Sequence, residues 1–491
     1  MEIEPVAADV TLPQKVIRSA WWVTLYTIVT KLINPVITMI LARLLAPEDF
    51  GLMGMAATAI SLVSIIGDAG MGQAMIQRKG QVKQIANVVF YNSMALGIIW
   101  FLVNYAAAPF VAGYFRTDQV VLVVRVLGLS FLLSPLISVP RDLLVKELEF
   151  KQLLFINLLP MLAQGVVSIL SAYLGYGVWA LVIGQLSGSL LTAIAIWQVT
   201  KWRPRLGYDW QMSRELLGFG SAIVGQNFLA WLMTSSDQAF LGRFQGAVST
   251  GIFRLGNNLA LMPYTLTTAP LMQVMYPAFC KIQQDRESLR NYYLNVVELI
   301  SLFSFSVGPL AIFSAPYFMP ILGDKWVTAI PIMQLLIIRG VFGSVVCVNP
   351  EIYKAIDRPG ITTAFYAVRI LFSVPIYYFT AQMGLVPLCL GHLGLNCVFA
   401  PLNTLVVSRV LRVPLRRIWK SLRLSFLIGG MLCGLGILLS QGAAILGLSG
   451  APILMLALQV VTFASVSLLL LLAFARSKIF KIKLMVMNYI S

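Results

Sequence analysis

The chain has 491 residues, of which 59% are hydrophobic and 11% are charged, and its mean hydropathy is +0.84. A water-soluble protein cannot cover that much apolar surface, so the composition excludes a soluble enzyme or a soluble binding domain. The formal net charge of +17 does not indicate a nucleic-acid partner, because membrane proteins concentrate Lys and Arg in their cytoplasmic loops.

Long apolar segments recur along the whole chain, and each has about the 20 residues that an α-helix needs to cross about 30 Å of hydrocarbon. The connections between these segments are short, and no soluble domain is inserted. The sequence therefore predicts an all-α polytopic membrane protein with about 14 transmembrane helices. In chain order, we expect these helices at residues 20–43, 51–74, 86–111, 119–140, 153–174, 177–199, 216–241, 249–274, 292–314, 328–350, 360–381, 384–408, 421–440 and 450–474.

The Lys and Arg residues are distributed unevenly between the connections. If both termini lie in the cytoplasm, as an even number of spans requires, most basic residues fall on the cytoplasmic side. The outer side holds only Arg43, Arg116, Arg243 and Lys325. This asymmetry predicts a multi-pass protein with both termini in the cytoplasm, and it accounts for most of the net charge.

The sequence also contains the signs of an internal repeat. LARLLAPEDFGL at residues 41–52 aligns without a gap with LGRFQGAVSTGI at 241–252. GVWALVIGQL at residues 177–186 aligns with GLVPLCLGHL at 384–393. The first six spans would therefore repeat as the next six. Because six is even, both halves face the same way, which predicts a parallel repeat about an axis along the membrane normal, with a central cleft and alternating access.

Three parts follow from this repeat. We expect an N-lobe at residues 1–200, a C-lobe at 201–410, and a last part at 411–491 with two extra helices and a basic cytoplasmic tail.

Polar residues follow one face of the first helix of each expected lobe. The first span carries Thr24, Thr27, Lys31, Asn34 and Thr38, and the seventh carries Asn227, Trp231, Thr234 and Gln238. Hydroxyl and amide groups also join neighbouring helices in lipid, which is the alternative interpretation. Lys31 favours a water-filled cleft, because an ammonium group in mid-membrane needs a polar environment.

The charged residues inside the predicted spans are mostly basic. They are Lys31, Arg125, Arg254, Arg339 and Arg369, against the acids Asp68, Asp237 and Glu298. A charge at the bilayer centre costs about 3 kcal/mol or more, so it needs solvent or a partner. The cationic excess predicts a cleft of positive potential and an anionic substrate that carries phosphate or pyrophosphate, for which Arg offers bidentate donors.

These considerations give the candidate site residues. The substrate-binding candidates are Lys31, Asn34, Arg125, Arg254, Arg339, Arg369, Asn227 and Gln238. The acids Asp68, Asp237 and Glu298 are candidates for ion coupling or for pairing, as Asp237 could pair with Arg254.

Metal, cofactor and catalytic sites are not expected. The only histidine is His392, and the five cysteines are scattered without a CxxC pair. The glycine-rich segment at residues 67–72 follows no strand, and no GxxxxGK[ST] motif occurs, so ATP is not the expected energy source. Coupling to Na⁺ or H⁺ is possible, but the sequence does not identify the energy source: a gradient of either ion, the membrane potential, or mass action from polymerisation in the outer leaflet remain open.

Several motifs carry a family resemblance, and they cover nearly the whole chain. They are LARLLAPEDFGL at 41–52, DAGMGQAMIQRKG at 68–80, GYGVWALV at 175–182, KWRPRLGYDW at 201–210 and SDQAFLGRFQGAVSTGIF at 236–253. Together they resemble the polysaccharide-transporter branch of the multidrug/oligosaccharidyl-lipid/polysaccharide (MOP) exporter superfamily. Within that branch, the chain is most similar to colanic acid exporter-type flippases of lipid-linked oligosaccharides.

The resemblance implies a V-shaped fold of two six-helix lobes in the bacterial cytoplasmic (inner) membrane. It implies export of undecaprenyl-pyrophosphate-linked repeat units for exopolysaccharide, O-antigen or capsule synthesis. The implied partners are this lipid-linked glycan, the bilayer, and the polymerase and chain-length proteins of the same pathway. The functional residues of the family are cavity charges rather than a fixed motif, so no site residue carries over by position.

Two alternatives remain open at the level of sequence. A drug or cation antiporter of the same superfamily would need acids in mid-span, whereas this chain offers mostly bases. A membrane polysaccharide polymerase or ligase would need a large outer loop with catalytic residues. The longest outer loop, at residues 314–327, has only Asp324 and Lys325 as charges.

Overall fold

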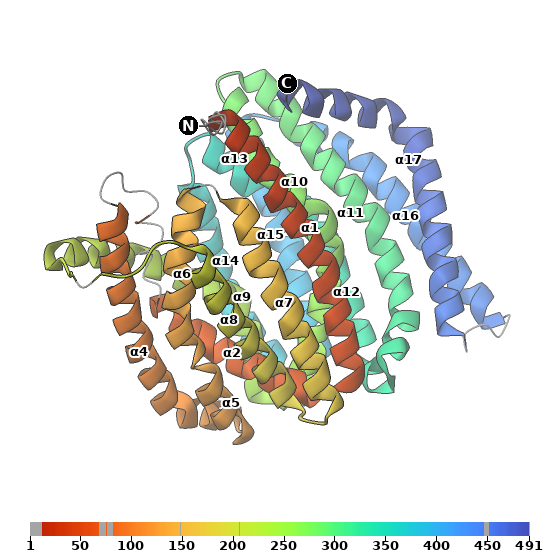
Figure 1. Ribbon diagram of the computed structural model, residues 1–491. Helices are drawn as coiled ribbons and strands as arrows, with labels where there is room; N and C mark the ends of the chain where they lie inside the picture. The colour runs from red at the N-terminus through yellow and green to blue at the C-terminus, as the bar shows by residue number, and fades with distance from the viewer. Residues whose placement is uncertain are drawn as a thin grey trace, which may run out of the picture. The chain divides into compact units, whose positions relative to one another are not determined.

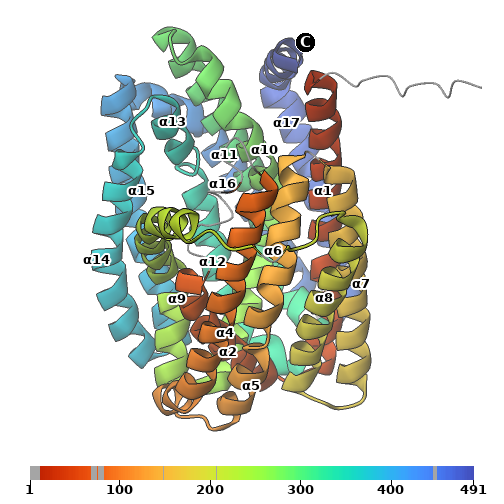
Figure 2. The same ribbon diagram turned by 60° about the vertical axis from the view of Figure 1, so that its left-hand side comes forward.

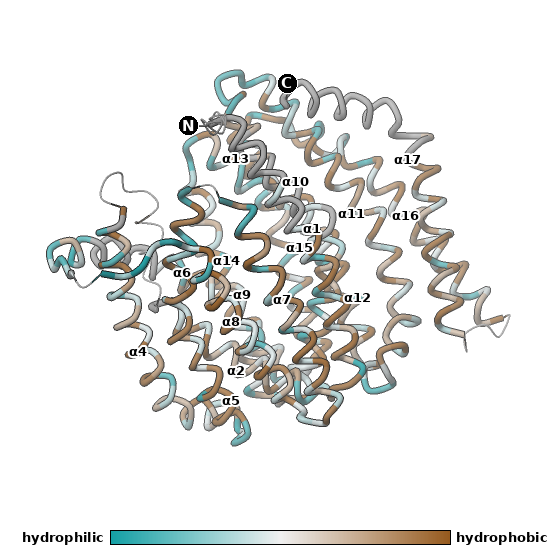
Figure 3. The backbone as a smooth tube through the Cα atoms, viewed as in Figure 1, coloured by the Kyte–Doolittle hydropathy of each residue, from teal (hydrophilic) through white to brown (hydrophobic). Residues whose placement is uncertain are grey.

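The structure is a computed structural model that describes most of the chain. It describes residues 12–67, 75, 82–147, 149–205, 207–445 and 451–490. All regular secondary structure in these ranges is helical, without a strand, as the apolar segments predicted (Figure 1). In Figure 3 the helices are mostly hydrophobic along their middles, while the connection between α10 and α11 is hydrophilic.

Eleven of the helical segments in the described ranges are long and apolar enough to cross a membrane. They coincide with eleven of the predicted spans, which confirms a multi-pass membrane protein. The predicted spans at residues 20–43, 216–241 and 249–274 are helical as well, but they are not among these eleven. The total of about 14 transmembrane helices therefore stays a prediction.

The chain divides into two compact units. Unit 1 consists of Met1–Leu45 and Leu52–Trp231, and unit 2 consists of Ala46–Gly51 and Leu232–Ser491. The boundary thus falls inside a helix at Trp231, whereas the expected lobes meet between residues 200 and 201. The internal repeat and the three expected parts stay predictions.

Unit 1 is built from the helices that precede this boundary. They are α1 (Leu12–Leu44), α2 (Pro47–Gly67) from Leu52 onward, α4 (Val82–Phe115), α5 (Gln119–Leu127), α6 (Ser130–Lys146), α7 (Phe150–Tyr173), α8 (Val178–Val199) and α9 (Trp210–Ala260) as far as Trp231. Helix α7 packs along α8 and against α1, and α4 packs against α5 and α6 (Figure 1).

The predicted span at residues 119–140 is divided into α5 and α6. A buried amide packs at this division, where Asn104 Nδ2 on α4 donates to the Val124 carbonyl oxygen at 2.8 Å. A Cβ atom on Gly128 would overlap the same amide nitrogen, so only glycine leaves room for it. A side chain that binds helical carbonyls in this way commonly kinks a membrane helix.

A hydrogen-bond network attaches the start of α9 to unit 1. Asn92 Nδ2 on α4 donates to Ser213 Oγ at 3.0 Å, and Tyr208 Oη lies 2.6 Å from Asn92 Oδ1. Farther along α9, Trp231 Nε1 donates to Ser61 Oγ at 3.0 Å. These contacts explain why the unit boundary lies about one helix later than the sequence repeat indicates.

Unit 2 is built from the remaining helices. They are the rest of α9, α10 (Met262–Ile282), α11 (Arg286–Leu322), the short η1 (Asp324–Ala329), α12 (Ile330–Ser344), α13 (Asn349–Ala355), α14 (Gly360–Met383), α15 (Leu385–Leu411), α16 (Leu415–Ile445) and α17 (Pro452–Ile490). Helix α11 packs against α12, α16 and α17, while α15 packs against α12 and α14 (Figure 2).

The two turns that align in sequence contact each other inside unit 2. Helix α9 breaks at Gly246, where φ is 76°, a backbone conformation that glycine adopts without strain. This break separates the predicted spans at residues 216–241 and 249–274. A Cβ on Gly51 would overlap the Ala247 carbonyl oxygen, and a Cβ on Gly251 would overlap that of Pro47. Because Pro47 aligns with Ala247 and Gly51 with Gly251, the contact is reciprocal, the form expected between copies related by a two-fold axis.

Candidate functional site

A cluster of polar side chains lies between the helices of unit 2. Its members are Asp237 on α9, Arg339 on α12, Arg369 and Tyr377 on α14, and His392 on α15. Asp237 and His392 are buried, with exposed fractions of 8% and 3%. The cluster therefore combines the predicted candidates Asp237, Arg339 and Arg369 in one place.

His392 is the centre of the cluster. Its Nδ1 lies 3.0 Å from Arg339 Nη1 and 2.9 Å from Tyr377 Oη. Its Nε2 lies 3.2 Å from Asp237 Oδ2, although that contact is not aligned as a hydrogen bond. The imidazole thus stands between a carboxylate and a guanidinium.

The helices place these groups by simple spacing. Arg369 and Tyr377 are eight residues apart on α14, and His392 and Asn396 are four apart on α15, so each pair shares a helix face. Asn396 Nδ2 also donates to the backbone oxygen of Arg339 at 3.1 Å, which joins α15 to α12 at the same level.

Aromatic rings hold the imidazole in position. Phe253 is stacked on His392 with ring centroids 6.0 Å apart, and the Tyr377 ring lies at 4.2 Å. The ring of His392 is therefore packed by both aromatics, and its nitrogens are directed to the charged groups.

The chemistry of Arg339 assigns the hydrogen on the imidazole. A guanidinium can only donate, so the Nδ1 of His392 accepts and its hydrogen is on Nε2, toward Asp237. The neutral ring then connects the negative Asp237 with the positive Arg339. Arg369 adds a second positive charge, in electrostatic range of Tyr377 and Arg339.

The expected pairing of Arg254 with Asp237 is wrong for the residues that the structure describes. Asp237 contacts His392 instead, and it also accepts a hydrogen bond from the Gln238 backbone at 2.7 Å. The buried Nη1 of Arg254 has no hydrogen-bond partner among the described residues.

The other predicted candidates lie outside the cluster. In unit 1, Arg125 stacks on the Tyr105 ring with its guanidinium carbon 4.3 Å from the centroid. Lys31 is half-buried, and Asn34 on the same helix is exposed. The remaining candidates are Asn227, exposed on α9; Gln238, half-buried on α9; Glu298, buried on α11; and Asp68, which lies outside the described residues.

Sequence reasoning missed His392 and Tyr377. A signal for His392 was present in the repeat, because it aligns with Gln185 and both positions are polar inside an apolar segment. Tyr377 has no comparable signal. No group of three potential metal ligands occurs among the described residues.

A cavity lined largely by serines lies in unit 1. It has a volume of about 250 Å³, and its lining includes the hydroxyls of Ser64, Ser93, Ser134 and Ser138. Trp100 also lines it, and the buried Nε1 of this indole has no hydrogen-bond partner among the described residues. Hydroxyl groups beside an indole can contact a sugar ring, because the hydroxyls bond to its polar groups and the indole packs on its apolar face.

Comparisons with known proteins identify the family of the chain. Residues 40–331 match the family model described as "Polysaccharide biosynthesis protein". The chain is 24% identical over 426 residues to the teichuronic acid biosynthesis protein TuaB of Bacillus subtilis (strain 168), covering 85% of this chain and 87% of that protein. It is 24% identical over 403 residues to the lipopolysaccharide biosynthesis protein WzxC of Escherichia coli (strain K12), covering 81% of this chain and 82% of that protein.

Solved structures support the same fold. The lipid II flippase MurJ, in an inward closed conformation, matches with a TM-score of 0.73 and 13% identity, covering 94% of this chain and all of that chain.

Proposed function

The chain belongs to the polysaccharide biosynthesis protein family, and we propose that it flips undecaprenyl-pyrophosphate-linked oligosaccharide repeat units across the bacterial cytoplasmic membrane. At the coarser level it is a multi-pass membrane transporter of the MOP exporter type and not an enzyme. The proposed route is alternating access, with both termini in the cytoplasm. Polymerase and chain-length proteins would use the exported units.

The buried charge cluster is the observation that carries this proposal. Arg339 and Arg369 supply two positive charges, whereas Asp237 supplies one negative charge and His392 is neutral. Within the described ranges, no carboxylate lies within 4.0 Å of the Arg369 guanidinium. An unpaired charge in an apolar interior is costly, and a bound anion offsets that cost. A pyrophosphate has the oxygens to receive a bidentate guanidinium.

The same cluster supports H⁺ rather than Na⁺ as the coupling ion. Sodium would have to bind beside the Arg339 guanidinium and would be repelled. A proton can instead be taken up at the contact between the His392 imidazole and Asp237, whose atoms lie 3.2 Å apart. Protonation there makes the cluster more positive and strengthens its attraction for an anion, so proton uptake and substrate binding would be linked.

The serine-lined cavity of unit 1 supports the glycan part of the proposal. Its Trp100 indole N–H is a donor for a sugar, and its serine hydroxyls are donors or acceptors, in a space of about 250 Å³. A drug antiporter, which binds cations, has no need for this combination of hydroxyls and half-buried guanidinium groups.

The test is transport by purified protein in proteoliposomes with a short lipid-pyrophosphate-oligosaccharide. Wild type should flip this lipid, and Arg369→Ala should flip it at least tenfold more slowly at equal incorporation. Lys354→Gln is the matched control, since it removes a positive charge from an exposed ion pair with Glu351 outside the cluster. Transport of cationic drugs with no transport of the lipid would replace this proposal with the antiporter.

A further inference from the structure

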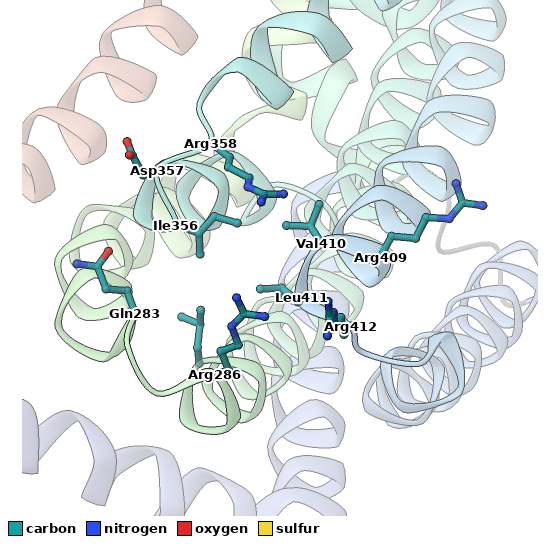
Figure 4. A pocket seen from close by; sticks show the side chains of 10 residues that line it. Gln283, Arg286, Ile356, Asp357, Arg358, Arg409, Val410, Leu411 and Arg412 are labelled. Atoms are coloured by element: carbon teal, nitrogen blue, oxygen red, sulfur yellow. The ribbon is translucent and has the colours of Figure 1, made fainter.

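A second set of arginines lines a cavity at one end of unit 2. The cavity has a volume of about 590 Å³. Three connections form its walls: Arg286 begins α11, Arg358 precedes α14, and Arg409 and Arg412 end α15 (Figure 4). The sequence predicts a cytoplasmic position for all three connections, and the structure brings them together at one site.

The cavity has an excess of positive charge. Its lining includes four guanidinium groups and a single carboxylate, that of Asp357. Figure 4 shows the guanidinium groups of Arg286 and Arg358 directed toward the middle of the cavity, whereas the Asp357 carboxylate points away from it. The acid therefore does not neutralise the centre.

The four arginines have no acidic or hydrogen-bonding partner in the part of the chain that the structure describes. Among the residues that the structure describes, none of the four guanidinium groups has a carboxylate within 4.0 Å or a hydrogen-bond acceptor. Arg290, on α11 of the same unit, differs, because its Nε donates to the Leu411 carbonyl at 2.6 Å. The four cavity arginines are exposed instead, so their guanidinium groups are open to a ligand.

The backbone at the cavity is specialised as well. Asp357 and Arg412 have φ angles of 58° and 52°, and only one other non-glycine residue in the described ranges, Arg116, has a positive φ. Such a conformation costs a side-chain-bearing residue about 1–2 kcal/mol. At Arg412 it ends α15, with the backbone N–H bonded to Arg409 and Ser408 carbonyls, so that Arg409 and Arg412 both lie on the cavity.

The helix dipoles alone do not explain why the four arginines lie at this cavity. Basic residues near the end of α15 stabilise that helix terminus, which accounts for Arg409 and Arg412. Arg286 stands at the start of α11, where a positive charge is unfavourable. Arg358 lies between the end of α13 and the start of α14, so the dipoles of these two helices act on it in opposite directions. A bound anion would offset the unfavourable position of Arg286.

We propose that this cavity binds a phosphate-bearing anion. Its volume is in the range of about 300–1,000 Å³ typical of ligand pockets and exceeds what a bare phosphate fills. Basic pockets between membrane helices on the cytoplasmic side hold anionic headgroups by the same chemistry. The phosphate belongs either to an anionic inner-leaflet lipid or to a soluble compound. The site shares no residue with the Asp237–His392 cluster, so it does not depend on the proposed function.

The experiment measures binding to purified protein in neutral detergent. One arm titrates phosphatidylglycerol in mixed micelles against phosphatidylcholine, and the other titrates sodium pyrophosphate against sodium sulfate at equal ionic strength. Native mass spectrometry and thermal unfolding report occupancy. We expect saturable binding in one arm, which identifies the source, and at least tenfold weaker binding for the double variant Arg286→Gln/Arg358→Gln.

The control is Arg416→Gln/Arg417→Gln, which makes the same charge change at two exposed residues of α16 that do not line the cavity. It should bind within twofold of wild type. Arg409→Gln alone provides a second cavity variant if the double variant is poorly folded, and it should also weaken binding. Absence of saturable binding in both arms, or equal weakening in the control, overturns the proposal.

Discussion

Arg339 on α12 donates to the imidazole of His392 on α15, with Nη1 3.0 Å from Nδ1, and thereby fixes which ring nitrogen carries hydrogen. The opposite ring nitrogen is 3.2 Å from Asp237 Oδ2. Three helices are thus connected through one neutral ring. A change in charge at any of these three groups alters the electrostatic balance of the other two.

His392→Gln is expected to separate transport from its pH dependence. A glutamine amide can accept from Arg339 and donate to Asp237, but it cannot titrate. Asp237, Tyr377, Arg339 and Arg369 are the other ionisable groups facing this position. If His392 takes up the coupled proton, the variant should flip lipid down its concentration gradient while uphill transport no longer responds to an imposed pH gradient. Wild-type pH dependence in the variant would assign the proton to Asp237 or another group.

Arg339→Lys should fail to replace arginine. Lysine keeps the positive charge but loses the planar fork that reaches both the imidazole and an anion. We expect export of the polymer to fall about tenfold, which corresponds to roughly 1.4 kcal/mol. The readout is polymer export in a deletion strain, normalised to protein in the membrane. Full export by the lysine variant would mean that only the charge matters.

Gly51→Ala should destabilise the protein. The new methyl group would meet the Ala247 backbone, which cannot rotate away as a side chain could. Overpacking of this kind costs about 1–3 kcal/mol, so the variant should show lower membrane abundance and a lower Tm in detergent. Gly394→Ala is the control, because nothing lies within 4 Å of the position that its Cβ would take. Equal behaviour of both variants would show that the turn relaxes.

Asp285 should make stability depend on pH. Its carboxylate accepts hydrogen bonds from Ser288 Oγ at 2.6 Å and from the backbone N–H groups of Ser288 and Glu287 at the start of α11. The hydroxyl bond, followed by the backbone bonds, holds the pKa of this carboxyl below its ordinary value. A depressed pKa contributes stability above the unfolded-state pKa, and this contribution is lost as pH falls through the folded-state pKa.

Asp285→Ala is therefore expected to lower the Tm at pH 7, with a smaller difference from wild type as the pH falls into the acid range. Scanning calorimetry or fluorescence-detected unfolding in detergent checks this. A difference that does not change with pH would show that the charge contributes nothing to the cap.

Cysteine labelling tests the proposed orientation. In a background without the five native cysteines, a cysteine at position 416 should react only after the cytoplasm is opened, and one at position 48 should react from outside intact cells. The opposite pattern would reverse the topology and place the arginine-lined cavity outside.

Apolar segments predicted the helices well, because the length of a membrane-spanning helix depends on hydrocarbon thickness and follows from the segment's own sequence. The break between α5 and α6 was missed, since it depends on Asn104 from another helix. The cationic excess directed attention to Arg339 and Arg369, which the structure places near each other in unit 2. It could not separate them from Arg125, whose partner is the Tyr105 ring, nor identify His392 as their centre. These pairings arise only when four helices come together.

The reciprocal contact of Gly51 and Gly251 has a consequence for biosynthesis. Residues 46–51 belong to unit 2 by packing, yet the ribosome makes them about 180 residues before Leu232, where the rest of that unit begins. The second unit is therefore discontinuous in the chain, and it cannot complete its packing from residues 232–491 alone. Residues 46–51 are inserted first, and Gly51 stays without its packing partner until the turn at residues 247–251 has been inserted. A fragment that starts at residue 232 should need the first hairpin supplied in trans before it assembles.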